Sequence, residues 1–100
     1  RDRRILSENG IVIVSLTIDG KNGNVLAGPD IISRGFVFIR ESQELIGEAE
    51  GLARDALKEL EKKNVTDWST IKKAVIDSID NYFYKKTRRR PFILPIINEV

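Results

Sequence analysis

The chain has 100 residues, of which 41% are hydrophobic, and it contains no histidine, cysteine or methionine. Without histidine and cysteine it lacks the usual imidazole acid or base, a thiolate nucleophile and the ligands of a typical zinc site. Its length suits one domain with one modest core. We therefore expect a single compact unit that holds no metal or cofactor and whose role is not catalysis.

The first residues predict a piece of a larger protein, because the chain opens on Arg1-Asp2-Arg3-Arg4 and not on methionine. Residues 1–10 are predicted to end a linker from a preceding domain, and residues 11–100 to form the domain itself. No apolar run approaches the roughly 18 residues that cross a bilayer. The absence of cysteine fits a reducing compartment, so we expect a cytoplasmic protein.

Charge is unevenly distributed along the chain. The net charge is +2, yet one segment supplies +5, so the remainder carries −3. The five residues of this segment, called the basic cluster below, are Lys85, Lys86, Arg88, Arg89 and Arg90. Because the rest is slightly acidic, the chain lacks the uniformly basic surface typical of proteins that track nucleic acid.

The clearest strand is Ile11–Ile18, which is β-branched and too short for a helix. Its even positions are all apolar and are predicted to face the core. The odd positions are Ile11, Ile13, Ser15 and Thr17.

A hairpin is predicted after this strand, because residues 19–24 are rich in Asp, Asn and Gly. Val25–Ala27 is the expected returning strand, and Gly28-Pro29-Asp30 is expected to break it. Phe36–Ile39 is predicted to be a further strand.

Two amphipathic helices follow, since the apolar period changes to that of a helix. The first is expected to begin at Ser42 as N-cap and to stop at Asn64. Its predicted apolar stripe is Leu45, Ala49, Leu52, Ala53, Ala56, Leu57 and Leu60.

The second helix is expected to begin at Thr66 or Asp67 and to end before Pro91, with cations at its negative end. Its predicted buried side is Trp68, Ile71, Val75, Ile79, Tyr82 and Phe83.

The last run, Phe92–Ile97, is apolar on both alternating faces and contains Pro95, which predicts an edge or bulged strand. The predicted fold is therefore α+β: a small, mostly antiparallel sheet of three to four strands with two amphipathic helices packed on one face.

The other sheet face is predicted to be an interface, because it keeps more apolar residues than a solvated face should. The sequence does not determine which alternate set of the last strand faces the helices. The interface candidates are Ile11, Ile13, Phe92, Leu94 and Ile96.

Two further patterns are interpreted as structural. Gly20-Lys21-Asn22-Gly23 matches the GxxG of KH domains, but that loop joins helices, so a plain hairpin turn is favoured. Acidic groups at Asp77 and Asp80, and at Glu41, Glu44 and Glu48, could serve acid/base catalysis only inside a cleft. A solvated helix face is favoured for them.

The basic cluster has two interpretations that the sequence leaves open. With aromatic residues beside it, it is a candidate RNA contact, and five contacts to single-stranded phosphates would give a log-log salt slope of roughly −3.5. Alternatively, it caps the second helix and pairs with acidic groups across a domain interface.

Three stretches in this order resemble one protein family. They are Arg1-Asp2-Arg3-Arg4-Ile5-Leu6-Ser7, Gly28-Pro29-Asp30-Ile31-Ile32-Ser33-Arg34-Gly35-Phe36-Val37 and Lys86-Thr87-Arg88-Arg89-Arg90-Pro91-Phe92-Ile93-Leu94-Pro95. Over essentially the whole chain, they resemble the C-terminal domain of the ribonuclease J family of bacterial metallo-β-lactamase/β-CASP enzymes.

The resemblance implies a parent enzyme that hydrolyses RNA phosphodiester bonds from 5′ ends and internally at a two-metal centre, usually zinc. The His and Asp ligands of that centre belong to the other domains, so no catalytic residue carries over. The family's C-terminal domain supports activity and forms oligomers, which implies ribonuclease J-like chains as homo- or hetero-oligomeric partners, and RNA through the parent.

The resulting hypothesis is a non-catalytic assembly domain of a ribonuclease J-like exo- and endonuclease of RNA processing and decay. The alternative is a freestanding RNA-binding module that uses the basic cluster. A third option, a small carboxylate-based enzyme, requires a deep pocket that contains two acids.

Overall fold

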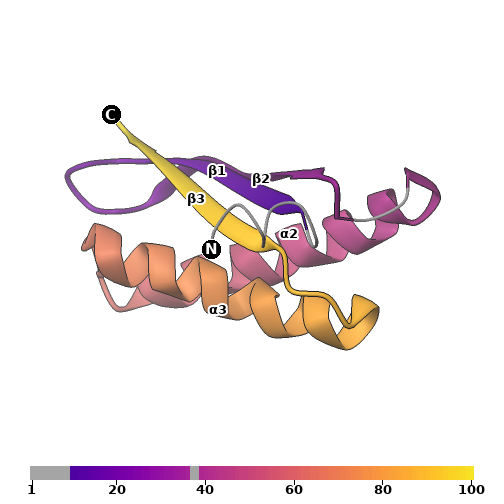
Figure 1. Ribbon diagram of the computed structural model, residues 1–100. Helices are drawn as coiled ribbons and strands as arrows, with labels where there is room; N and C mark the ends of the chain where they lie inside the picture. The colour runs from indigo at the N-terminus through magenta and orange to yellow at the C-terminus, as the bar shows by residue number, and fades with distance from the viewer. Residues whose placement is uncertain (1–9, 37–38) are drawn as a thin grey trace.

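The structure, a computed structural model, describes residues 10–36 and 39–100, and gives the backbone alone for residues 39–42. Three strands and two helices make up the described part (Figure 1). In chain order they are β1 (Ile11–Ile18), β2 (Val25–Arg34), α2 (Ile39–Lys62), α3 (Trp68–Thr87) and β3 (Phe92–Glu99). The predicted α+β class is confirmed, and nearly all of the predicted linker lies outside the described residues.

The sheet has the order β2-β1-β3, with β1 in the centre. β1 pairs with β2 antiparallel through the hairpin and with β3 parallel. A parallel pair needs a long crossover, and the two helices supply it by returning the chain to the end of the sheet where β1 starts. The sheet is therefore mixed, with one pair of each kind.

β2 is longer than predicted. The expected break at Gly28-Pro29-Asp30 is a bulge inside one strand: Ser15 lies opposite Asp30 and Thr17 opposite Ala27, so two residues of β2 face one of β1. Gly28 has φ +87°, and a Cβ there would lie 2.6 Å from the Ser15 carbonyl oxygen. Glycine at this position lets the strand bend and continue.

The predicted strand at Phe36–Ile39 is wrong at Ile39, where α2 begins, and residues 37–38 lie outside the described part. Phe36 is a buried bend residue whose ring packs edge-to-face on Phe83, with centroids 4.9 Å apart. One aromatic anchor explains its apolar character without a strand. Ser42 accordingly lies inside α2 and is not its N-cap.

The helix boundaries otherwise follow local chemistry. Asn64, with φ 57°, lies just beyond α2, as predicted for its stop. Asp67 is the N-cap of α3 and accepts hydrogen bonds from the Thr70 N–H at 3.0 Å and the Thr70 hydroxyl at 2.8 Å. At the other end, Arg88 adopts the left-handed conformation and its N–H donates to the Tyr84 carbonyl at 2.7 Å.

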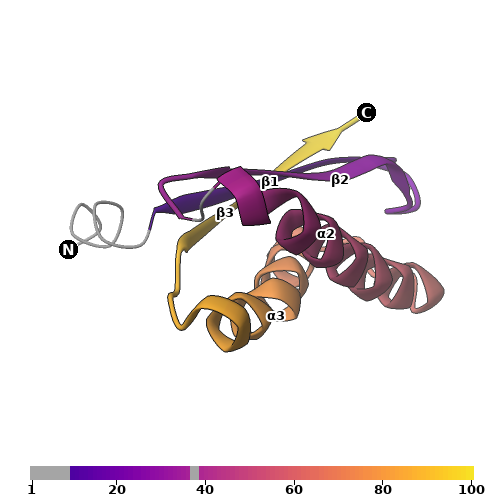
Figure 2. The same ribbon diagram turned by 90° about the vertical axis from the view of Figure 1, so that its right-hand side faces the viewer.

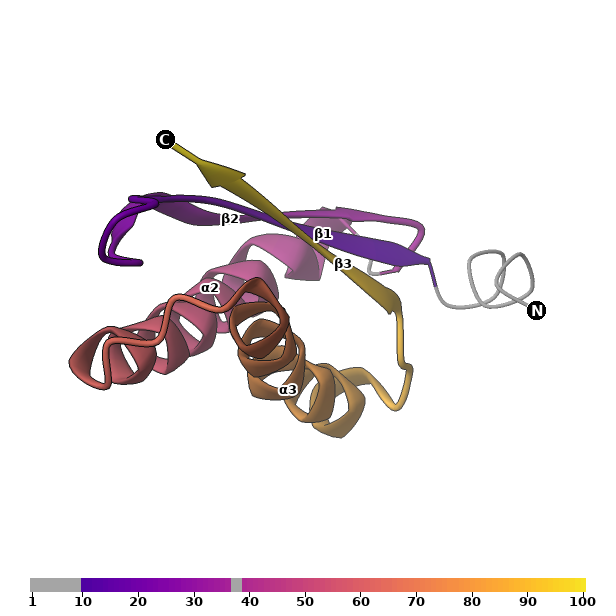
Figure 3. The same ribbon diagram turned by 90° about the vertical axis from the view of Figure 1, so that its left-hand side faces the viewer.

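Both helices cover the same face of the sheet (Figures 2 and 3). The even side chains of β1 are 0–2% exposed, which confirms the predicted core face. The predicted buried residues of α3 are confirmed at Ile71, Val75, Ile79 and Phe83.

Two apolar residues predicted on the buried stripes are exposed. Trp68 is 44% exposed, and its indole N–H donates to Glu99 Oε1 at 3.0 Å. Leu52 is 38% exposed. Trp68 is the first residue of α3 and lies at the end of its apolar stripe, whereas Leu52 lies at the side of the stripe formed by Ala49, Ala53 and Leu57.

Candidate functional site

The outer face of the sheet, opposite the helices, is built from the odd residues of β1 and their partners. Three rows of side chains cross the strands in the order β2, β1, β3. They are Arg34–Ile11–Phe92, Ile32–Ile13–Leu94 and Asp30–Ser15–Ile96. We call the six apolar members, Ile11, Ile13, Ile32, Phe92, Leu94 and Ile96, the outer patch.

In the described part of the chain, both helices lie on the opposite face of the sheet from the outer patch (Figure 2). Phe92, Leu94 and Ile96 are 38–40% exposed and Ile32 is 50% exposed. Ile93 and Ile97 are only 8% and 9% exposed and face the helices. The odd residues of β3 therefore face the core and the even residues face outward, which the sequence had left undetermined.

All five predicted interface candidates therefore lie together on one face. Ile32 was missed, because the Gly28-Pro29-Asp30 break concealed the strand that follows it. The run Asp30–Arg34, β-branched at both isoleucines, was the available signal. A sheet covered on one side is normally polar on the other, so this apolar face is suited to contact with another protein surface.

The free edge of β3 is less suited to pairing than the face. The Phe92 N–H donates to the Gly10 carbonyl at 3.0 Å and the Val100 N–H to the Ile18 carbonyl at 3.1 Å, so even residues of β3 point their backbone groups to β1. Pro95 is at an odd-numbered position of the edge strand β3, so its backbone groups point away from β1 and toward the free edge. It has no N–H to donate there, which is a common protection of edge strands.

Two members of the basic cluster, Arg89 and Arg90, bind groups within this domain. The Arg89 guanidinium donates to the Phe36 carbonyl at 2.5 Å and to the Gly35 carbonyl at 3.3 Å. Arg90 pairs with Asp80 and lies 4.4 Å from the centre of the Tyr84 ring. These two cations have structural contacts, but their partners lie within this domain, whereas the structural interpretation had expected partners across a domain interface.

The other three members, Lys85, Lys86 and Arg88, are exposed. Arg88 lies 5.6 Å from the centre of the Tyr84 ring, which is itself 37% exposed. An exposed aromatic face beside guanidinium groups can stack a base, so a smaller RNA-contact candidate persists at this end of α3.

The GxxG sequence is the turn of the β1–β2 hairpin. The Gly23 N–H donates to the Asp19 carbonyl at 2.7 Å and the Gly20 N–H to the Val100 carbonyl at 3.0 Å. The Lys21 N–H donates to Asp19 Oδ1 at 2.8 Å. A phosphate clamp needs unoccupied amides, and these three are used within the domain.

Acidic residues are spread over solvated helix faces. Asp77 pairs with Lys73 at 3.4 Å on α3, and Asp80 pairs with Arg90. Among the described residues, no three His, Cys, Asp or Glu side chains are grouped in a way that could hold a metal ion.

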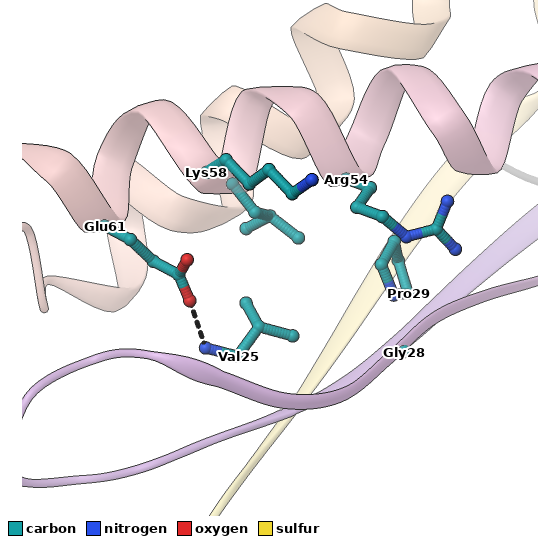
Figure 4. Close-up of a pocket in the computed structure, with 7 residues that line it drawn as sticks. Val25, Gly28, Pro29, Arg54, Lys58 and Glu61 are labelled. Atoms are coloured by element: carbon teal, nitrogen blue, oxygen red, sulfur yellow. Dashed lines mark hydrogen bonds between the residues drawn. The ribbon is translucent and has the colours of Figure 1, made fainter.

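Two hollows in the described part of the chain are lined by carboxylates. A cavity of about 190 Å³ between β2 and α2 has one carboxylate, Glu61, which accepts from the Val25 N–H at 2.6 Å (Figure 4). A hollow of about 330 Å³ is lined by Glu48 and Asp55, both exposed, beside Tyr82.

Tyr82 donates a hydrogen bond to Glu48, and its burial, followed by the charge of Glu48 and Glu44, raises the pKa of its hydroxyl above the ordinary value. A phenol with a raised pKa stays protonated and is a poor base. The two carboxylates of this hollow, Glu48 and Asp55, are both exposed, whereas carboxylate catalysis requires two acids in contrasting environments.

Within the described residues, neither helix has the length and apolar character needed to span a membrane.

The sequence profile of the ribonuclease J C-terminal domain matches residues 1–100. The chain is 46% identical over 100 residues to ribonuclease J2 of Bacillus subtilis, and 46% and 45% identical over 101 residues to ribonuclease J 2 of Staphylococcus epidermidis and Staphylococcus aureus. Each match covers 100% of this chain and 18% of the relative. The chain therefore belongs to the ribonuclease J C-terminal domain family.

Proposed function

We propose that this chain is the non-catalytic assembly domain of a ribonuclease J-like enzyme and that it forms homo- or hetero-oligomers through the outer patch. The parent enzyme would be a cytoplasmic RNA exo- and endonuclease with metallo-β-lactamase and β-CASP domains. An oligomer holds two catalytic bodies at a fixed spacing, which is how a domain without chemistry supports RNA processing and decay.

The observation that carries the proposal is the exposed apolar face of the sheet. Six apolar side chains lie in three adjacent rows; in the described part of the chain four of them are exposed, and Ile11 and Ile13 between them are partly buried. The open face of a sheet that is covered on one side is normally polar, so an apolar face here favours contact with another protein surface. The proline at the free edge of β3 favours contact through the face over strand addition at that edge.

The residues of this chain do not fit the zinc that the parent would use. The chain has no His or Cys, and its described carboxylates are dispersed or paired with cations. Zinc-dependent hydrolysis would belong to the domains that share the parent with this one, and no step of it is assigned here.

Sedimentation of the purified chain over a range of concentrations tests the proposal. We expect self-association that is weakened by Leu94→Lys, which places a charge in the outer patch. Leu52→Lys on α2 is the matched control, because both leucines are 38% exposed. Equal behaviour of the two variants would contradict an interface on the sheet.

A nuclease assay tests the absence of catalysis. The chain should leave a labelled RNA intact with added zinc or magnesium. Cleavage that co-purifies with the chain through several columns would contradict the proposal.

An auxiliary RNA contact at the end of α3 is the second candidate, favoured by the exposed Tyr84 ring beside Arg88. Since Arg89 and Arg90 are engaged within the domain, three cations remain for phosphates. The expected log-log salt slope of single-stranded RNA binding is about −2, from about −0.7 per contact. A slope near zero would exclude the contact.

A further inference from the structure

The outer face carries one pair of opposite charges, and both belong to β2. Asp30 and Arg34 are exposed and flank Ile32 on the same side of the strand, since Ser15, Ile13 and Ile11 of β1 lie opposite them in turn. Four residues of strand separate the charges by about 13 Å. They lie too far apart to pair with each other within one chain.

This pattern is complementary to itself. If a second copy packs face to face about a two-fold axis that crosses the strands at the Ile32 row, each β2 runs antiparallel over the other. The row of Arg34 then faces the row of Asp30 in the second copy, and Ile32 faces its own equivalent. Contacts made twice, residue i to j and j to i, are what a two-fold interface requires.

The opposite orientation lacks this match. An axis along the strands would place β2 over β3, so Arg34 and Asp30 would face the rows of Phe92 and Ile96. Both charges would then be buried against apolar side chains without a partner, which is costly.

We propose that the outer patch binds a second copy of this chain with the two β2 strands antiparallel, joined by reciprocal Arg34–Asp30 ion pairs. This inference rests on the proposed function and adds the orientation and the residues that fix it.

The patch is small for a protein interface. Three strands about 4.8 Å apart and five residues at about 3.3 Å each give a flat area of roughly 200 Å², against about 800 Å² per partner in a standard interface. The dimer of this chain is therefore weak, and reciprocal charges contribute a large part of its specificity.

Charge exchange at the two positions tests the orientation. Asp30→Arg and Arg34→Asp each place like charges opposite one another twice per dimer, and we expect each variant to self-associate about tenfold more weakly than the original chain. The double variant restores opposite charges and should self-associate within about threefold of the original.

A mixture of the two single variants is the decisive sample. One copy then carries two acids and the other two arginines, so both pairs are opposite in charge, and the mixed dimer should form about tenfold more tightly than either variant alone. Sedimentation with one variant labelled measures this, and circular dichroism checks that each variant is folded.

The outcomes separate the two proposals. In one outcome, Leu94→Lys weakens self-association, but the mixture of Asp30→Arg and Arg34→Asp associates no more tightly than either variant alone. That result overturns the antiparallel orientation and leaves assembly through the sheet face in place. A chain that stays monomeric at every concentration overturns both, and the patch then serves a different partner.

Discussion

Replacing Arg89 with methionine separates the structural and RNA-binding interpretations of the basic cluster. The Arg89 guanidinium donates to the carbonyls of Phe36 and Gly35, and it lies 5.8 Å from the centre of the Phe36 ring. Methionine keeps a long apolar stem and removes every donor. The change therefore leaves the buried Phe36 carbonyl without this partner at the connection between β2 and α2.

The expected loss follows from the strength of a charged hydrogen bond. A bond from a charged donor contributes about 1.5–3 kcal/mol. Arg89 is partly exposed, and water can replace its weaker bond to Gly35, so we expect a loss of about 2 kcal/mol in the free energy of unfolding. Domains of 100 residues have about 5–15 kcal/mol in total, which makes this a large effect.

Urea denaturation followed by circular dichroism and Trp68 fluorescence measures the loss. Lys85→Met is the control: Lys85 is exposed, and the change should alter stability by less than about 0.5 kcal/mol. The effect on RNA affinity should be the opposite: Lys85→Met should bind RNA more weakly than Arg89→Met. A stable Arg89→Met protein that has lost RNA affinity would refute the structural role.

Three further outcomes are expected from the same denaturation assay. The hydroxyl and N–H of Thr70 lower the pKa of Asp67 from 3.8, so its cap stabilises the fold above that pH and is lost as the pH falls through the lower folded value; Asp67→Asn should flatten this acid dependence. Gly47→Ala should stabilise the fold by about 0.5–1 kcal/mol, because Gly47 is inside α2 with no atom within 4 Å of an added Cβ, and a drop would contradict that open space. Ile79→Ala, at 0% exposure, should cost about 2–5 kcal/mol, whereas Ile32→Ala, at 50%, should cost about 1 kcal/mol or less; equal costs would place Ile32 in the core.

Local chemistry in the sequence determined much of the fold. The alternation in β1 and the stripe of α3 from Ile71 to Phe83 depend on neighbours in the chain, and both were predicted correctly. The start of α3 was predicted at Thr66 or Asp67, and Asp67 is its N-cap. The same holds for Asn64, since a residue that tolerates positive φ marks a helix end wherever it occurs.

Local reasoning failed where one contact outweighed local preference. Gly28-Pro29 resembles a strand break, yet β1 holds the backbone on both sides of the bulge, so β2 continues to Arg34. Phe36 resembles the start of a strand, but its ring packs on Phe83, 47 positions away in the chain. No local pattern records either contact.

The candidate site shows the same division. The sequence alone indicated that more apolar residues exist than one sheet face can bury, and it shows that this segment has no histidine or cysteine. The tertiary structure decided which of them are exposed, because only the parallel pairing of β3 with β1 places Phe92, Leu94 and Ile96 beside Ile11 and Ile13. It also divided the basic cluster, since long side chains such as Arg89 bind whatever acceptors the fold brings near, and those acceptors come from distant parts of the chain.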